Sequence, residues 1–373
     1  MRLFVVGLDR RVVEIVWDRS ALPYLADVTW VSGGELLVTV QSRDQRRVEV
    51  LRAGTASGAT EPVFVDQDDQ WVELVRGVPS MLGGQRLVTC ADRDGARRLL
   101  VDGIAVTPTD VQVRAVVHTG DDHVVFLGNP IEDPTVQHVY RWSTQADVSA
   151  LTMEPGVHTA SAAGSTVVVR SATLGRPIAG TRVLDGPTLV SHAERPLVSP
   201  NVTMLRVGAR RLSAALLLPT GRSSRDGGPR LPVLMDPYGG PHAQRVVQSY
   251  TAMCASQWFA EQGFAVLVVD GAGTPGRGSR WEREVFHDLA APVLADQVDG
   301  LAGVAAECDV LDLSRVGIRG WSFGGYLAAL AVLRRPDVFH AAVAGAPVTE
   351  WRLYDTHYTE RYLGDPSIDP VPY

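Results

Sequence analysis

The sequence predicts an all-β N-terminal half followed by an α/β C-terminal half, and three observations indicate this division. Residues 1–198 contain short apolar strands between Gly, Asp and Arg turns, with almost no helical periodicity. After about Pro200, apolar strands without alternation take turns with helical stretches, as in a parallel sheet covered on both faces. The length of 373 residues is sufficient for two hydrophobic cores.

A pattern of small turn, apolar strand, polar turn and second strand recurs four times in the first half. The copies are "VSGGELLVTVQSRDQRRVEVLRA", "MLGGQRLVTCADRDGARRLLVDG", "HTGDDHVVFLGNPIEDPTVQHVYRWS" and "SAAGSTVVVRSATLGRPIAGTRVL". The glycines that mark them, Gly33, Gly83, Gly120 and Gly164, are 50, 37 and 44 residues apart. One propeller blade takes about 40 to 50 residues. We therefore expect a partial β-propeller of about four blades over residues 1–198, with an antiparallel sandwich as the alternative.

Composition narrows the classes of function. The net charge of −7 disfavours a nucleic-acid partner. Cys90, Cys254 and Cys308 are far apart, odd in number and without metal-ligand spacing, so we expect no disulfide framework, no metal and no cofactor. The N-terminus "MRLFVVGLDRR" does not have the pattern of a signal peptide, and no run of 18 apolar residues follows. These features predict a cytoplasmic protein without a membrane partner.

The second half has the element order of a parallel α/β sheet. "TMLRVGARRLSAALLLP" is read as a strand pair, and "RLPVLMDPYGG" and "GFAVLVVDGAG" as buried strands that end in turns. Helices are predicted over Ser249–Gln262, about Val293–Glu307 and Phe323–Arg334. We assign residues 199–373 to this second domain.

Ser322 lies in the sequence Gly320-Trp321-Ser322-Phe323-Gly324, which matches the G-x-S-x-G pattern of a nucleophile elbow. The motif follows the strand "RVGIR" and precedes the helix "GGYLAALAVL", as the pattern requires. Gly320 and Gly324 fit because the turn is too tight for side chains at those positions. The motif predicts an α/β-hydrolase domain with Ser322 as its nucleophile. The alternative is a glycine-rich turn that carries an inert serine.

A second motif, "MDPYGGPHAQ", supplies a candidate for stabilising negative charge in acyl transfer. An oxyanion hole needs hydrogen-bond donors aimed at the developing charge. One donor would be the backbone N–H of Phe323, which follows the serine. The other could be the hydroxyl of Tyr238, which follows a buried strand. The residues alone leave open a second interpretation, in which Tyr238 only caps the sheet.

Four motifs, in order, resemble the prolyl oligopeptidase family, most closely its dipeptidyl peptidase IV branch: "DPYGGPHAQ", "DGAGTPGRG", "GIRGWSFGGY" and "APVTEWRLYDTHYTERYLG". "PYLADVTW" and "LLVTVQSRDQRRVEVL" also resemble propeller blades of bacterial members. The resemblance implies that Ser322 is the nucleophile and Tyr238 the oxyanion tyrosine. It also implies a small apolar pocket for proline, lined by Val348, Trp351, Tyr354 and Tyr358. Simple core packing remains the alternative for Trp351.

The general base is the missing part of this machinery. In α/β-hydrolases the acid and the histidine follow the serine, and at about 30 residues for each strand-helix step this takes roughly 80 to 120 residues. Ser322 is followed by 51 residues, which contain only His340 and His357. We expect neither to be the base. The expectation is that the hydrolase domain is incomplete, with the Asp and His of the triad beyond Tyr373, and that earlier propeller blades precede residue 1.

The sequence therefore predicts a serine exopeptidase that releases N-terminal dipeptides with proline or alanine at the penultimate position. The isolated chain is expected to be inactive, because an unassisted serine is a weak nucleophile. Its partner would be a peptide substrate, and the resemblance allows a homodimer of the full-length protein. Acidic residues that anchor a substrate amine cannot be assigned. An acylaminoacyl peptidase or oligopeptidase of the same family, and a non-catalytic propeller scaffold that binds peptides, are the alternatives.

Overall fold

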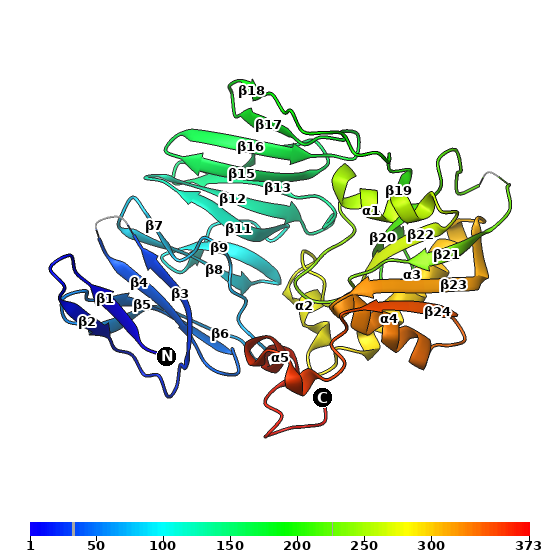
Figure 1. Ribbon diagram of the computed structural model, residues 1–373. Helices are drawn as coiled ribbons and strands as arrows, with labels where there is room; N and C mark the ends of the chain where they lie inside the picture. The colour runs from blue at the N-terminus through cyan, green and yellow to red at the C-terminus, as the bar shows by residue number, and fades with distance from the viewer. Residues whose placement is uncertain (32–33, 226) are drawn as a thin grey trace.

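The computed structural model describes residues 1–31, 34–225 and 227–373. In these ranges the chain forms a series of antiparallel sheets followed by one mixed sheet with helices. In Figure 1 the antiparallel sheets follow one another from the lower left to the top, and the mixed sheet lies on the right. Gly33, one of the four glycines that mark the predicted repeat, lies outside the described residues.

Four antiparallel sheets of four strands each build the first half, and every sheet keeps its strands in chain order. This serial arrangement is that of propeller blades and not of a two-sheet sandwich, so the predicted fold is confirmed. A hairpin precedes the blades. It is formed by β1 (Leu3–Val6) and β2 (Val12–Ile15). The first blade contains β3 (Tyr24–Trp30), β4 (Leu36–Gln41), β5 (Arg47–Ala53) and β6 (Thr60–Gln67), and the second contains β7 (Ser80–Leu82), β8 (Arg86–Arg93), β9 (Ala96–Val101) and β10 (Ile104–Ala105). The third contains β11 (Val111–Thr119), β12 (His123–Pro130), β13 (His138–Ser143) and β14 (Ala146–Ala150), and the fourth contains β15 (Val157–Ala163), β16 (Thr166–Ala172), β17 (Gly180–Val183) and β18 (Thr188–Leu189).

Alternating residues of the blade strands pack against the two neighbouring blades. In β12, Val124 and Phe126 belong to the core between the second and third blades, whereas Val125 belongs to the core between the third and fourth. All three side chains are fully buried. This period of two is the strand periodicity that the apolar runs indicate.

The mixed sheet of the second half has the strand order β19-β20-β22-β21-β23-β24, with its last four strands parallel. Its residues also alternate between two cores: Leu267 packs with α3 and α4, whereas Val266 and Val268 pack with α1 on the other face. None of the described helices combines the length and apolar character of a membrane span. The elements are β19 (Val202–Val207), β20 (Leu212–Leu217), β21 (Leu231–Met235), α1 (Tyr250–Ala260), β22 (Ala265–Asp270), α2 (Ser279–Glu282), η1 (Arg283–Val285), α3 (Ala291–Glu307), β23 (Leu311–Trp321), α4 (Phe323–Arg334), β24 (Ala341–Gly345), η2 (Trp351–Leu353) and α5 (Thr356–Leu363).

Candidate active site

Ser322 occupies the turn between β23 and α4 with a backbone conformation that few serines adopt. Its φ is 55° and its ψ is −117°. Positive φ is costly for a residue other than glycine and recurs where function requires a particular side-chain position. The N–H of Ser322 donates to the carbonyl of Gly345 (2.9 Å), and its carbonyl accepts from the N–H of Tyr326 (2.9 Å). The sheet and the helix therefore hold this strained turn from both sides.

The glycines of the motif are required by close backbone contacts. A Cβ added to Gly320 would lie 2.1 Å from the carbonyl oxygen of Gly324. One added to Gly324 would lie 2.7 Å from the carbonyl oxygen of Pro237, and one added to Gly325 would lie 2.3 Å from that of Gly345. No other residue fits these positions without moving the backbone, so the steric reason given for the sequence pattern holds in the structure.

Tyr238 follows β21 and faces the serine. Burial, followed by the nearby Tyr354, raises the pKa of Tyr238 above its ordinary value, although its interaction with the side chain of Ser322 lowers it. The rings of Tyr238 and Phe323 lie 5.9 Å apart. The approach depends on Gly240, because a Cβ there would lie 2.3 Å from the Phe323 ring. The structure thus brings together two residues that are 84 positions apart in the chain (322 − 238).

The backbone N–H of Phe323 is available beside this hydroxyl. Phe323 is the first residue of α4, so its N–H has no acceptor one turn earlier in the helix. Its side chain is buried, which fixes the start of the helix. A hydroxyl and a helix N-terminal N–H therefore converge near the Ser322 side chain, the arrangement that an oxyanion hole needs.

The four predicted pocket residues lie in and just before η2 and α5. The rings of Trp351 and Tyr358 stack at 6.1 Å with an interplanar angle of 15°, and Tyr354 meets Tyr358 edge to face at 5.3 Å. Val348 is half-buried and packs on the same core cluster. Burial, followed by Tyr362 and Tyr238, raises the pKa of Tyr358 well above its ordinary value. The rings of Trp351, Tyr354 and Tyr358 thus form one aromatic cluster that reaches Tyr238 through Phe323.

Trp351 serves packing as well. It is 8% exposed, belongs to the hydrophobic core of the second half, and its ring lies 6.0 Å from that of Phe323. Tyr354 differs from it, since 45% of its surface is exposed. Tyr354 is therefore the pocket ring that is most open to a ligand.

Contacts from the propeller hold α5, and sequence reasoning missed them. Arg361 lies in α5; its Nε donates to Gln45 (2.7 Å) and its Nη1 lies 3.3 Å from both carboxylate oxygens of Glu73. Arg43 binds Glu360 through two hydrogen bonds of 2.8 and 2.6 Å. No local signal could have indicated these pairs, because their partners lie 288 to 317 residues apart in the chain.

A second group that sequence reasoning missed is the buried carboxylate of Asp236, two residues before Tyr238. It is 2% exposed and accepts hydrogen bonds from Arg245 (2.8 Å), Arg319 (2.8 Å) and Ser256 (2.7 Å). These bonds tie the end of β21 to β23 and α1. The signal in the sequence was an acidic residue at the end of an apolar strand, which is costly to bury unless it is paired.

The histidines that follow the serine are engaged elsewhere. Nδ1 of His340 accepts from the backbone N–H of Val316 (3.0 Å), and Nε2 of His357 is hydrogen-bonded to Gln41 of the propeller (3.1 Å). Upstream, His242 is hydrogen-bonded to the hydroxyl of Tyr362 (2.6 Å). Across the described parts of the chain, none of the hydrogen bonds found joins a histidine to Ser322.

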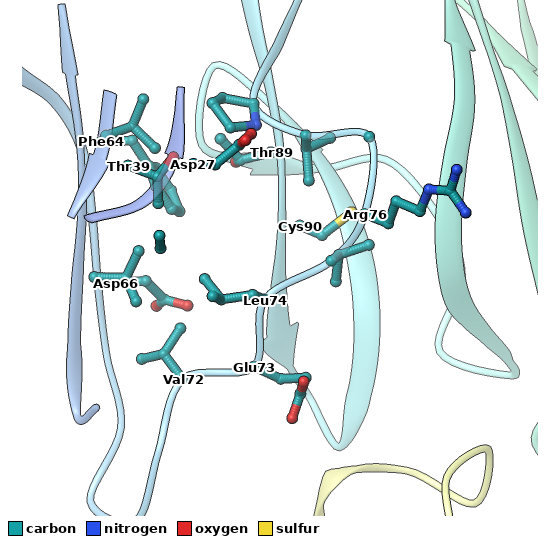
Figure 2. Close-up of a pocket in the computed structure, with 17 residues that line it drawn as sticks. Asp27, Thr39, Phe64, Asp66, Val72, Glu73, Leu74, Arg76, Thr89 and Cys90 are labelled. Atoms are coloured by element: carbon teal, nitrogen blue, oxygen red, sulfur yellow. The ribbon is translucent and has the colours of Figure 1, made fainter. Parts of the chain in front are cut away.

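A cavity of about 370 Å³ lies between the first and second blades, away from the serine. Its lining is mainly apolar, and the buried hydroxyls of Thr39 and Thr89 have no hydrogen-bond partner among the described residues. Figure 2 shows Thr39, Phe64 and Thr89 around this cavity, with the guanidinium of Arg76 pointing away from it. None of the predicted site residues lines this cavity, so it is separate from the cluster around Ser322.

Comparison with known proteins agrees with this geometry. The model of the dipeptidyl peptidase IV N-terminal region matches residues 1–177, and that of the prolyl oligopeptidase family matches residues 250–370. The chain is 42% identical to dipeptidyl peptidase 8 of Mus musculus over 148 residues, which is 39% of this chain and 17% of that protein. It is 27% identical to a probable dipeptidyl peptidase 4 of Emericella nidulans, over 96% of this chain and 51% of that protein.

Solved structures share the fold over the whole chain. The dipeptidyl peptidase 4 of Porphyromonas gingivalis superposes with a TM-score of 0.84 at 21% identity, covering 100% of this chain and 56% of that one. A putative dipeptidyl aminopeptidase IV from Bacteroides ovatus gives 0.84 at 19% identity and covers 59% of that chain. The chain thus spans about half the length of these full-length relatives. The chain thus matches the prolyl oligopeptidase family over residues 250–370 and the dipeptidyl peptidase IV N-terminal region over residues 1–177.

Proposed function

We propose that this chain is part of a serine exopeptidase that releases N-terminal dipeptides, with Ser322 as the nucleophile. The observation that carries the proposal is the strained turn at Ser322 with the Tyr238 hydroxyl in contact with its side chain. A peptide-binding scaffold has no need of a strained serine that faces a phenol. The names of the relatives support a peptidase, since each is a dipeptidyl peptidase or aminopeptidase.

In this proposal the oxygen of Ser322 attacks the carbonyl carbon of the penultimate residue. The negative charge that develops on the carbonyl oxygen is stabilised by the Tyr238 hydroxyl and the Phe323 N–H. The peptide bond breaks, the shortened peptide leaves as an amine, and the dipeptide remains as an ester on Ser322 until water releases it. Acylation needs a base that accepts the serine proton and gives it to the leaving amine, and deacylation needs the same base to accept a proton from water and return it to the serine oxygen.

The preference for proline or alanine is supported by the aromatic cluster. Tyr354 and Tyr358 meet edge to face, and Trp351 stacks on Tyr358. Such walls suit a rigid pyrrolidine ring, which packs on aromatic faces and loses little entropy on binding. Alanine fits the same space because it is smaller. A charged or long side chain would be buried there without a partner.

We also propose that residues 1–373 do not hydrolyse peptides on their own. This is supported by the placement of His340 and His357, whose ring nitrogens bind Val316 and Gln41. On this basis, neither supplies the base, and a base from outside these residues is needed. Localisation in the cytoplasm remains part of the proposal.

The experiment is hydrolysis of Ala-Pro-para-nitroanilide by the 373-residue chain, with and without imidazole as an external base. We expect no release of nitroaniline above that of Ser322→Ala without imidazole, and serine-dependent release with it. Tyr238→Phe should lower the imidazole-dependent rate by about 100-fold, the usual effect of losing one oxyanion donor.

Three outcomes would count against parts of the proposal. Serine-dependent hydrolysis without imidazole would show that the chain supplies its own base. Cleavage of acetyl-Ala-para-nitroanilide in preference to Ala-Pro-para-nitroanilide would favour the acylaminoacyl peptidase alternative. Equal rates for wild type and Ser322→Ala in imidazole would remove Ser322 as the nucleophile.

A further inference from the structure

Arg114 is an arginine at the junction of the two halves that has almost no protein partner. It lies in β11 of the third blade and packs against the loop that contains Gly276, where an added Cβ would lie 2.5 Å from Nη1 of Arg114. Within the described residues it makes one hydrogen bond, from Nη1 to Oδ1 of Asn129 at 3.4 Å, and no ion pair. A guanidinium carries five N–H donors and a permanent charge. Most of that donor capacity is therefore unused.

A neighbouring arginine, Arg97, shows what an ion-paired guanidinium at this junction looks like. Arg97 forms ion pairs with Glu282 (2.8 Å) and Asp92 (3.3 Å). Although burial lowers its pKa, these carboxylates raise it above the ordinary value. Burial lowers the pKa of Arg114, and Glu282 and Asp270, which raise it, do not offset burial. Among the described residues, carboxylates thus form ion pairs with Arg97 and none with Arg114.

Arg114 faces a cavity of about 330 Å³ between the third blade and the segment that leads into α1. Of the described residues that line this cavity, Arg114 alone is charged. Amide and hydroxyl groups surround it, together with apolar side chains. The polar lining residues are Asn129, Thr135, Gln137, Gln244 and Ser249.

The same arginine also borders a second cavity, which reaches the candidate active site. This cavity, of about 160 Å³, is lined by Arg114, His242 and Tyr362, and also by the ion-paired side chains of Glu73, Arg97 and Glu282. The rings of both His242 and Tyr362 contact that of Tyr358, at 5.4 and 5.1 Å. Arg114 therefore lies between the aromatic cluster and the amide-lined cavity.

We propose that Arg114 binds the C-terminal carboxylate of a short peptide in the amide-lined cavity. A single guanidinium matches a carboxylate monoanion, which accepts two parallel N–H bonds, whereas a phosphate dianion calls for more positive charge than this lining offers. The amide nitrogens of Gln137 and Gln244 donate to backbone carbonyls, and their side-chain carbonyl oxygens suit the peptide N–H groups that precede such a carboxylate. The identity of the ligand as a peptide rests on the proposed function, but the preference for a carboxylate does not.

The test is calorimetric titration of the 373-residue chain with N-acetyl-glycylglycine and with its C-terminal amide, which differ only in the carboxylate. We expect the acid to bind at least about tenfold more tightly than the amide, because a charge-assisted bidentate pair is lost with the amide. Arg114→Gln should reduce the affinity for the acid to that for the amide. Arg170→Gln, which removes an exposed arginine of β16, should leave it unchanged.

Three results would overturn the proposal: no measurable binding of the acid, equal binding of acid and amide, or unchanged affinity in Arg114→Gln. Tighter binding of inorganic phosphate than of the acid would also overturn it, in favour of a phosphate site. Should Arg114→Gln fail to fold, as judged by circular dichroism, the acid and amide comparison on unmodified protein still decides. Ser322→Ala should bind the acid as wild type does, so a failure of the serine chemistry leaves this test intact.

Discussion

The serine turn and the pocket segment, Trp351–Leu363, meet at one site but are held in different ways. The turn is fixed inside the second half: its glycines pack on one another, and Ser322 binds Gly345 of the adjacent strand. The pocket segment takes ion pairs and hydrogen bonds from Gln41, Arg43, Gln45 and Glu73 of the first blade and the loop after it. The difference teaches that the conformation of Ser322 is set by local sequence, whereas the position of the pocket segment depends on the assembly of both halves.

The largest loss of unfolding free energy is expected when the pocket segment loses its buried ion pair with the propeller. In Arg361→Met the carboxylate of Glu73 loses its principal partner, and both side chains are largely buried at 5% and 20% exposed. Breaking such a pair costs about 3 kcal/mol of unfolding free energy, because a buried charge is left uncompensated. Urea denaturation followed by tryptophan fluorescence would measure this loss.

A matched control tests whether the loss of stability depends on the burial of the ion pair or only on the loss of one positive charge. Arg335→Met removes an arginine from the exposed pair with Asp337, where the two side chains are 37% and 63% exposed. Exposed pairs contribute about 0.5 kcal/mol or less, so this variant should resemble wild type. Equal losses in the two variants would contradict the claim that the propeller link holds the pocket segment.

A smaller effect is expected when the serine turn is overfilled. Gly320→Ala places a Cβ 2.1 Å from a backbone oxygen, which cannot move aside as a side chain can. We expect a loss of about 2 kcal/mol in unfolding free energy, together with loss of the imidazole-dependent hydrolysis. Gly175→Ala, where an added Cβ meets nothing within 4 Å, should match wild type in the same denaturation experiment. If the two variants proved equally stable, the steric argument for the motif would fail.

The smallest effect is a change in how the unfolding free energy depends on pH, and it is expected from His242, which lies where the two regions meet. Burial lowers the pKa of His242 below 6.5, although Glu73 opposes the shift. As the pH falls, His242 therefore takes up its proton more readily in the unfolded chain than in the folded chain. The neutral His242 side chain thus contributes fully to the unfolding free energy above pH 6.5, and this contribution is lost as the pH falls through the pKa of the folded state.

Asparagine cannot titrate and tolerates the positive φ of 71° at this position. Between about pH 7 and pH 5.5, wild type should therefore lose more unfolding free energy than His242→Asn. The exposed His192 offers the control variant His192→Asn, which should keep the wild-type slope. If the unfolding free energy of His242→Asn changed with pH as that of wild type does, protonation of His242 would not affect stability.

The parts of the fold that local patterns predict are those whose physical cause is local. The helix predicted over Phe323–Arg334 has those same bounds as α4, because the glycines and the apolar run define it. In the blades, the repeated pattern found the second and third strands. The outer strand β14 was missed because its residues are mostly exposed, and without an apolar alternation a strand leaves little periodic signal.

The rest of the site follows from contacts between distant residues. Glu73 and Gln45 look like ordinary surface residues in the sequence, yet Gln45 is fully buried against α5. Arg114 gives no signal either, since only the placement of the third blade against the Gly276 loop reveals that it forms no ion pair with a described residue. The residue types were visible, but their partners were not.

The link between Arg361 and the first blade has a consequence for building hybrid enzymes. A hydrolase half grafted onto the propeller of another member would bring Arg361 and Glu360 without the Glu73, Gln45 and Arg43 that neutralise and position them. The graft would keep a well-formed serine and lose the shape of its pocket. The two halves of this protein are therefore not independent units for exchange. A hybrid would need residues 41–73 and residues 351–363 from the same parent.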